Sequence, residues 1–185
     1  MSIAVVRSYL PLFKLRICSL ITFVAVVGLF AASSNGFSVK SAAFLIAATM
    51  LASAAASAFN HYFDSDIDAV MNRTRKRPLP SGTVRAGSDV LIISALLFAL
   101  SLLISLYALN YMVALHLALG AFVYAVVYTV WLKRRSWLNI IVGGLAGSFA
   151  VLAGGASVAP EFCAPPVRLA IVMFFWTPSH FWSFA

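Results

Sequence analysis

Three of the chain's five carboxylates lie in one short segment, residues 60–68, with the sequence NHYFDSDID. In a helix, residues four apart lie on nearly the same face, so Asn60, Asp64 and Asp68 form one polar stripe and Asp66 points to the other side. Carboxylates one turn apart repel each other unless a cation lies between them. Mg²⁺ suits such a pair, because it usually binds one or two carboxylates and takes its other ligands from water and phosphate. The stripe therefore predicts a magnesium site with Asp64 and Asp68 as ligands.

A run of cations follows the acidic stripe. Arg73, Arg75, Lys76 and Arg77 lie in residues 73–82, which also contain two prolines. Each segment alone has a plainer interpretation, the acidic one as a solvated helix end and the basic one as an anchor at a membrane surface. Together they form the two halves of a site for a polyanion bridged by Mg²⁺, and a diphosphate fits both halves.

The composition indicates which kind of protein positions these residues. Of 185 residues, 63% are hydrophobic and 10% are charged, and the mean hydropathy is +0.99. A soluble domain is typically about 45–50% apolar and about 25% charged, so we exclude a soluble domain and expect an integral membrane protein. Stretches without charge predict an all-α, polytopic bundle of six spans, at residues 17–39, 41–63, 90–132 (two spans that turn near 107–111), 136–160 and from 169 onward.

Lys and Arg are distributed unevenly between the predicted loops. Of the 13 basic residues, 11 lie in the N-terminal segment and in the loops after the second and fourth spans. The positive-inside rule places these segments in the cytoplasm, together with the acidic stripe, Lys133 and Arg134. The net charge of +8 is then a topology signal, and we expect no nucleic-acid partner. A diphosphate bound at this face would bury a lipid tail among the spans.

These residues resemble the UbiA superfamily of intramembrane prenyltransferases, whose first Asp-rich motif has the spacing of Asn60, Asp64 and Asp68. Residues 77–82 (RPLPSG) continue the likeness. Residues 128–147 and the segment Trp176 to Trp182 (WTPSHFW) are similar to the protoheme IX farnesyltransferase branch of that superfamily. The likeness extends from about Leu12 to the last residue. It implies a UbiA-like bundle of nine helices, of which residues 1–185 form the N-terminal two-thirds of a single membrane domain.

The resemblance also implies an activity. The donor would be farnesyl diphosphate, the acceptor haem B and the product haem O, with Mg²⁺ as cofactor, in a bacterial inner membrane. Haem-handling or oxidase-assembly proteins are then possible partners, beside the lipid bilayer. The resemblance implies that Asn60, Asp64 and Asp68 are catalytic and that His180 contacts haem. The diphosphate would be held by six cations, namely Arg73, Arg75, Lys76, Arg77, Lys133 and Arg134.

Three departures from the family pattern leave alternatives open. The chain stops within the sixth expected helix, before the second Asp-containing motif, so we expect it to be C-terminally truncated. Residues 149–151 (FAV) stand where the family usually has two prolines, and the loop at 161–166 is unusual. The alternatives are a related enzyme with an aromatic acid or chlorophyllide as acceptor, an inactive remnant, or a cation transporter subunit. A transporter is disfavoured because no Asp, Glu, Lys or Arg lies at a span centre.

The sequence does not assign a role to the two other histidines, His61 and His116. His61 adjoins the acidic stripe but points about 100° away from Asn60 on a helix. For His116, early in the fourth span, we expect a hydrogen bond across helices.

Overall fold

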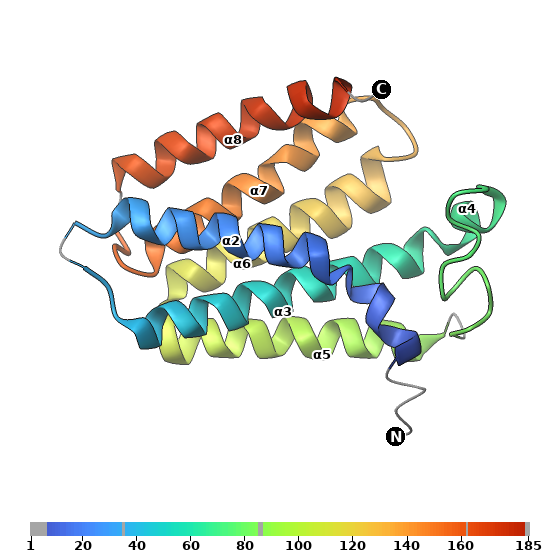
Figure 1. The fold of residues 1–185 in the computed structure, drawn as a ribbon, viewed down its shortest axis with the longest axis horizontal. Coiled ribbons are helices and arrows are strands. Elements are labelled where there is room, and N and C mark those ends of the chain that lie inside the picture. Colours follow the sequence, from blue (N-terminus) through green and yellow to red (C-terminus); the bar gives the residue numbers. More distant parts are fainter. Residues whose placement is uncertain (1–6, 35, 85–86, 162, 184–185) are drawn as a thin grey trace.

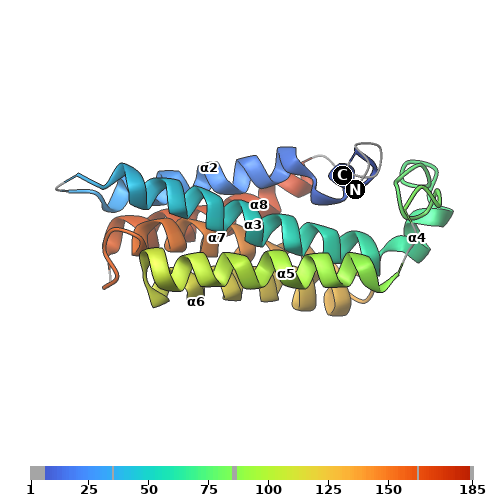
Figure 2. The same ribbon diagram turned by 90° about the horizontal axis from the view of Figure 1, so that it is seen from below.

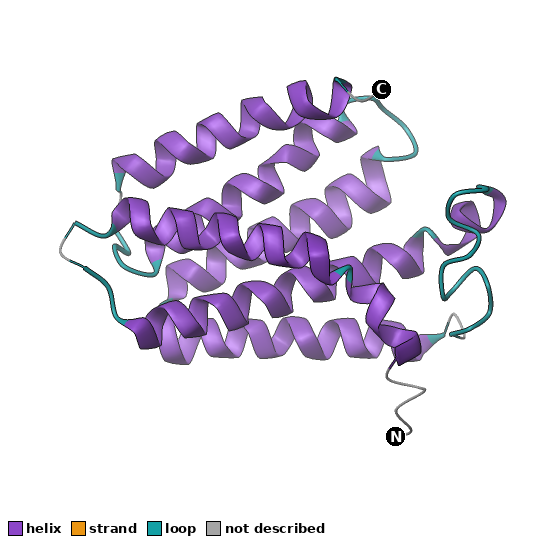
Figure 3. Ribbon diagram, viewed as in Figure 1, coloured by secondary structure: helices purple, strands orange, loops and turns teal. Residues whose placement is uncertain are grey.

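A computed structural model describes residues 7–34, 36–84, 87–161 and 163–183, and within these residues all regular structure is helical (Figures 1 and 3). Six long helices and four shorter elements follow one another along the chain. In order they are η1 (Leu10–Phe13), α2 (Leu15–Ala32), α3 (Val39–Phe63), α4 (Ser65–Val70), α5 (Ser88–Ile104), η2 (Ser105–Leu109), α6 (Tyr111–Phe122), η3 (Val123–Leu132), α7 (Asn139–Ala156) and α8 (Ala164–Trp182).

Five helical segments are long and apolar enough to cross a membrane, and two of them include the π-helical turns η2 and η3. They are Leu15–Ala32, Val39–Phe63, Ser88–Leu109, Tyr111–Leu132 and Asn139–Ala156. Many of their large apolar side chains are exposed on the outside of the bundle, as lipid contact requires. The chain is therefore a multi-pass membrane protein, as its composition predicts.

Most helix boundaries lie within four residues of the predicted spans, and α2 and α8 are the exceptions. Helix α2 ends at Ala32, whereas the charge-free stretch predicted a span that continues to residue 39. The predicted turn between the third and fourth spans is confirmed at Asn110, whose extended backbone separates η2 from α6 and whose side chain caps α6. Helix α8 begins at Ala164 and not near 169, because two prolines occupy its first turn, where a missing N–H is tolerated. It has the length of a span but is less apolar than the other five, and it packs along α7.

The helices lie roughly side by side, and each pair of long helices joined by a loop runs in opposite directions (Figures 1 and 2). Helix α3 packs mainly on α5, and α7 packs on α2, α6 and α8. Small residues make these contacts close: a Cβ added at Gly28 or Gly154 would overlap the backbone of the facing helix, α7 or α2 respectively. Such small residues are typical of helix interfaces in membranes, where close van der Waals packing replaces the hydrophobic effect.

Antiparallel packing brings the elements of the predicted site to one end of the bundle. Helix α4 and the C-terminal end of α8 lie at the end where α2 begins, together with the loop between η3 and α7 (Figure 1). The loops after α2 and α7 and the turn at Asn110 lie at the opposite end. The acidic stripe and the cations that precede α2 and follow η3 are therefore neighbours, although they are far apart in the sequence.

Candidate functional site

The acidic stripe lies where α3 gives way to α4. Helix α3 ends at Phe63, and the backbone N–H groups of Asp64 and Asp68 still donate to the carbonyls four residues earlier, at 3.0 and 2.8 Å. The i, i+4 spacing is thus kept across the junction. Asn60, Asp64 and Asp68 are 3%, 2% and 5% exposed, and Asp66 faces outward, as the periodicity predicts.

Asp64 is at the centre of a hydrogen-bond network. Its Oδ2 accepts a 2.7 Å hydrogen bond from Nδ2 of Asn60 and pairs with the ammonium of Lys133. Nδ2 of Asn60 also donates to Oγ1 of Thr129 at 3.2 Å, which ties α3 to η3. The other carboxylate oxygen, Oδ1 of Asp64, is buried and has no hydrogen-bond partner among the residues that the structure describes. A buried carboxylate oxygen without a partner is costly, so this atom is available to a bound cation.

Asp68 is held by the loop that follows α4. Arg77 donates to its Oδ2 at 2.6 Å, and the hydroxyl of Thr74 donates to its backbone carbonyl at 3.0 Å. The loop folds back because Leu79 and Val84 are buried in a small apolar cluster with Leu12, Ala58 and Val90. Burial of two loop side chains therefore places Arg77 beside the acidic stripe.

Lys14 is a member of the site that the sequence did not single out. Its ammonium donates to Oδ1 of Asn60 at 2.8 Å. Its backbone is left-handed, with φ of 46°, where η1 turns into α2. Burial, followed by the charges of Arg77 and Lys133, lowers the pKa of Lys14 to about 8. In the sequence, Lys14 stands out only as a cation at the start of the first span. Such a cation is equally well explained as part of the charge bias that sets the membrane topology.

The other predicted cations differ in where they lie. Arg134 binds Asp66 at 2.7 and 2.9 Å and so lies on the outward side of the stripe, where it lowers the pKa of Asp66 by hydrogen bonding. Arg73, Arg75 and Lys76 are exposed on the loop after α4, and none of them forms an ion pair with any residue that the structure describes. Of the six predicted cations, the structure brings Arg77 and Lys133 onto the acidic stripe.

The three histidines occupy different environments. His180 stacks on Trp176 with ring centroids 4.3 Å apart, near the charged end of the bundle. His61 is 3% exposed, and neither ring nitrogen has a hydrogen-bond partner among the described residues. The expectation for His116 was wrong: its Nδ1 bonds to the carbonyl of Met112, one turn earlier in its own helix, at 2.7 Å. Because that carbonyl can only accept, Nδ1 carries the proton.

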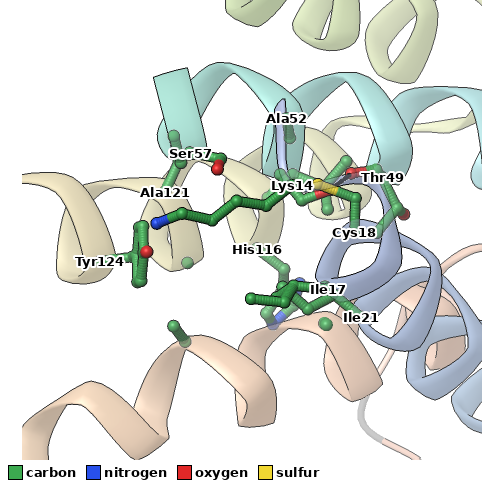
Figure 4. Close-up of a pocket in the computed structure, with 16 residues that line it drawn as sticks. Lys14, Ile17, Cys18, Ile21, Thr49, Ala52, Ser57, His116, Ala121 and Tyr124 are labelled. Carbon is green, nitrogen blue, oxygen red and sulfur yellow. Dashed lines mark hydrogen bonds between the residues drawn. The ribbon is translucent and has the colours of Figure 1, made fainter. Parts of the chain in front are cut away.

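A cavity of about 80 Å³ leads from the site into the bundle between α2, α3, α6 and α7. We call it the central cavity. Its lining includes Lys14, Ile21, Thr49, His116, Leu117 and Tyr124. Figure 4 shows the side chain of Lys14 extending along it toward Tyr124. The central cavity therefore joins the polar stripe to an apolar interior.

The residues present fit a magnesium ion that is shared with a phosphate. Among the described residues, no group of three His, Cys, Asp or Glu side chains converges as a metal site. On the acidic stripe, the described residues offer two buried carboxylates, Asp64 and Asp68, and Oδ1 of Asp64, which has no partner among them, is a suitable oxygen ligand. Mg²⁺ is commonly bound in this way, with water and substrate phosphate completing its shell.

Relatives at 40–47% sequence identity include proteins named protoheme IX farnesyltransferase. The chain is 47% identical to protoheme IX farnesyltransferase 1 of Paramagnetospirillum magneticum over 97% of this chain and 62% of that protein. It is 45% identical to the protoheme IX farnesyltransferase of Neorickettsia sennetsu over 97% of this chain and 60% of that protein. The chain thus spans about three-fifths of the length of these relatives.

Solved structures of similar fold are UbiA homologues at low sequence identity. A UbiA homologue from Archaeoglobus fulgidus, bound to GPP and Mg²⁺, matches with a TM-score of 0.74 and 21% identity, over 94% of this chain and 61% of that one. A digeranylgeranylglyceryl phosphate synthase structure matches with a TM-score of 0.76 and 21% identity, over 91% and 57%. The model of the UbiA prenyltransferase family matches residues 20–185. The chain with its buried acidic stripe therefore belongs to the UbiA prenyltransferase family.

Proposed function

We propose that this protein is a protoheme IX farnesyltransferase, which transfers the farnesyl group of farnesyl diphosphate to a vinyl group of haem B. The observation that carries the proposal is the unpartnered, buried Oδ1 of Asp64, set among cations at the mouth of an apolar cavity. Relatives at 45–47% identity bear this name, which supports haem as the acceptor. No feature of the described residues favours an aromatic acid, a chlorophyllide or cation transport.

The proposed reaction breaks the allylic C–O bond, and the diphosphate leaves with the electron pair. A vinyl carbon of haem then forms a C–C bond to the farnesyl cation, and water adds to the cation left on the acceptor and loses a proton to the solvent, which leaves a hydroxyl group. A Mg²⁺ ion bound to Asp64 and Asp68 would neutralise the charge that grows on the leaving diphosphate. Lys14, Arg77 and Lys133 add positive charge at the same place, and this charge acts more strongly in the transition state than in the ground state.

Two ion pairs of the site involve cations that would also serve the diphosphate. Arg77 and Lys133 now neutralise Asp68 and Asp64. Asp64 and Asp68 would hold the Mg²⁺, which would neutralise their charge, and Arg77 and Lys133 would then be able to bind the diphosphate oxygens. Arg73, Arg75 and Lys76, exposed on the adjacent loop, then remain candidates for the outer diphosphate oxygens, Arg134 for a neighbouring position and His180 for a contact with haem.

The proposed orientation places the charged end of the bundle in the cytoplasm of a bacterial cell, in its inner membrane. The bias of Lys and Arg toward this end supports it. Farnesyl diphosphate is anionic at its head, so a site at the cytoplasmic mouth meets the donor in water while the tail enters the bundle. Haem-handling or oxidase-assembly proteins would then deliver haem or receive the product.

The test is product formation by membranes that contain the full product of the gene. We expect labelled farnesyl diphosphate and haem B to give haem O in the presence of Mg²⁺, and a chelator to abolish it. Prenylation of another acceptor, with no haem O, would identify a related prenyltransferase. A donor that binds but is not transferred to any acceptor would indicate an inactive protein.

A further inference from the structure

Thr129 lies on η3 against the acidic stripe and is fully buried, with 0% of its surface exposed. Its hydroxyl makes two hydrogen bonds. Oγ1 donates to the backbone carbonyl of Tyr124 at 2.8 Å and accepts from Nδ2 of Asn60 at 3.2 Å. Thr129 therefore links a backbone carbonyl of η3 to the first residue of the acidic stripe.

The direction of these hydrogen bonds follows from the chemistry of the hydroxyl. A threonine hydroxyl has one proton, and a backbone carbonyl can only accept. The proton of Thr129 is therefore on the Tyr124 carbonyl, and toward Asn60 the same oxygen can only accept. The Asn60 atom that faces Thr129 must then be the donor Nδ2, which leaves Oδ1 facing the ammonium of Lys14. Thr129 thus fixes which way round the Asn60 amide lies.

The π-helical geometry of η3 places Thr129 at this position. In an α-helix a threonine hydroxyl commonly bonds to the carbonyl three or four residues earlier, whereas Thr129 bonds to the carbonyl five residues earlier. The backbone N–H of Lys133 likewise donates to the carbonyl five residues earlier, at 2.9 Å. Thr129 contacts Asn60, and Lys133 contacts Asp64. The wide helix, a kind of segment that is frequent at functional sites, therefore presents two polar side chains to two successive residues of the stripe.

The described partners of Asn60 differ in how a ligand would affect them. Lys14 and Asp64 are charged, so a bound diphosphate would attract the first and a bound Mg²⁺ the second. Thr129 is uncharged and buried, and its proton is held by the backbone, so neither ligand competes for it. Thr129 is therefore the partner that can keep the Asn60 amide oriented while the site is occupied.

The orientation of Asn60 decides which oxygen of Asp64 is free. Nδ2 of Asn60 donates to Thr129 and, at 2.7 Å, to Oδ2 of Asp64. Lys133 pairs with that same carboxylate oxygen. Both contacts thus lie on Oδ2, and Oδ1 has no partner among the described residues. An Asn60 amide that lost its anchor could rotate toward Oδ1 and occupy the position proposed for the metal.

We propose that Thr129 is a positioning residue of the diphosphate site, whose hydroxyl holds the Asn60 amide on Oδ2 of Asp64 and so keeps Oδ1 open to the metal. The proposal rests on the proposed function for the identity of the ligands. It adds a residue that acts on them only through Asn60.

Removal of the hydroxyl at constant shape tests the proposal. The readout is binding of labelled farnesyl diphosphate to the full product of the gene, without haem and therefore without turnover, at increasing Mg²⁺ concentration. Thr129→Val should raise the Mg²⁺ concentration for half-maximal binding about tenfold, the effect of one hydrogen bond of ordinary strength. Thr129→Ser keeps the hydroxyl and should remain close to the wild type.

Thr22→Val is the matched control. Thr22 is also buried, at 6% exposed, but its hydroxyl has no partner among the described residues, so its loss should leave the Mg²⁺ dependence unchanged. If Thr129→Val lowers only the amount of binding-competent protein, the role of Thr129 is merely structural and the proposal is overturned. An equal rise in Thr129→Ser also overturns it, because the hydroxyl is then not the cause. Both results leave the proposed function intact, whereas a wild-type protein that binds no farnesyl diphosphate refutes the function and the positioning role together.

The wild-type protein offers a second measurement, which applies even if Thr129→Val does not fold. With ¹⁵N-labelled asparagine, the side-chain N–H signals of Asn60 are identified by their loss from Asn60→Ala. The N–H that faces Thr129 should be protected from hydrogen exchange, and it should stay protected after Mg²⁺ and farnesyl diphosphate bind. Loss of this protection on binding would show that Thr129 does not hold the amide in the occupied site.

Discussion

The ammonium of Lys14 donates a 2.8 Å hydrogen bond to Oδ1 of Asn60, a residue 46 positions later in the sequence. With its Oδ1 on Lys14 and its Nδ2 on Asp64 and Thr129, the Asn60 amide uses both of its N–H donors and one of the two lone pairs of its oxygen. Lys14 thus orients the first residue of the acidic stripe and stands at the opening of the central cavity. If the proposed function is right, a cation at this position guides the diphosphate head of the donor to the stripe.

Lys14→Met should raise the KM for farnesyl diphosphate by about ten- to a hundredfold, because a charge-assisted hydrogen bond at the site is lost. Lys14→Arg keeps the charge but not the shape of the ammonium, so its KM should lie between those of the wild type and Lys14→Met. Arg16→Met is the matched control, since Arg16 is exposed two residues later in the chain. Steady-state kinetics with membranes of each variant measure the effect. Equal KM values for Lys14→Met and Arg16→Met would show that Lys14 does not contribute to binding of the donor.

Asp64→Asn and Asp68→Asn should each lower turnover by about a hundredfold or more, because each removes a charged ligand from the proposed metal site. Asp66→Asn is the matched control, since Asp66 is exposed on the opposite side and binds Arg134. It should retain near wild-type turnover. Haem O formation, normalised to the amount of inserted protein, gives the comparison. Full activity in both Asp64→Asn and Asp68→Asn would contradict the metal assignment.

Local periodicity was sufficient to predict the spans and the stripe. Both depend on residues close in sequence: charge-free stretches of span length, and side chains at i, i+4 and i+8. The opposed position of Asp66 follows from the same geometry. The stripe is confirmed because α3 continues with nearly helical hydrogen bonding into α4. Five of the six predicted spans are confirmed as helices long and apolar enough to cross a membrane.

The partners of the stripe could not be predicted in the same way. Lys14 reaches Asn60 through the packing of α2 on α3 and through a left-handed turn that lysine rarely adopts. The separation of Arg77 from Arg73 depends on how the loop after α4 is anchored by Leu79 and Val84. Neither contact produces a pattern among residues that are close in the sequence. Spacing along the chain therefore places Arg73 and Arg77 in one group of cations, although the fold separates them.

Lys133→Met should destabilise the protein by about 1–3 kcal/mol, because it leaves the buried carboxylate of Asp64 without its cation. The value lies toward the lower end of the range for buried pairs because Lys133 is itself 35% exposed. Adding Asp64→Asn should restore most of the lost stability, since the unpaired charge is then gone. The double-mutant cycle is measured from thermal unfolding in detergent. Additive effects of the two substitutions would show that the ion pair contributes no coupling energy.

Gly154→Ala should destabilise the bundle by about 1–3 kcal/mol, because the added Cβ would overlap the carbonyl oxygen of Ala25 and force α7 away from α2. Gly147→Ala, two turns earlier in α7, is the matched control: its Cβ would meet Cε of Met173 at 3.6 Å, an ordinary contact. Alanine also favours the helix over glycine, so Gly147→Ala should be neutral or slightly stabilising. Thermal unfolding of the two variants in the same detergent separates the effects. Equal melting temperatures would mean that α2 and α7 are not held in direct backbone contact.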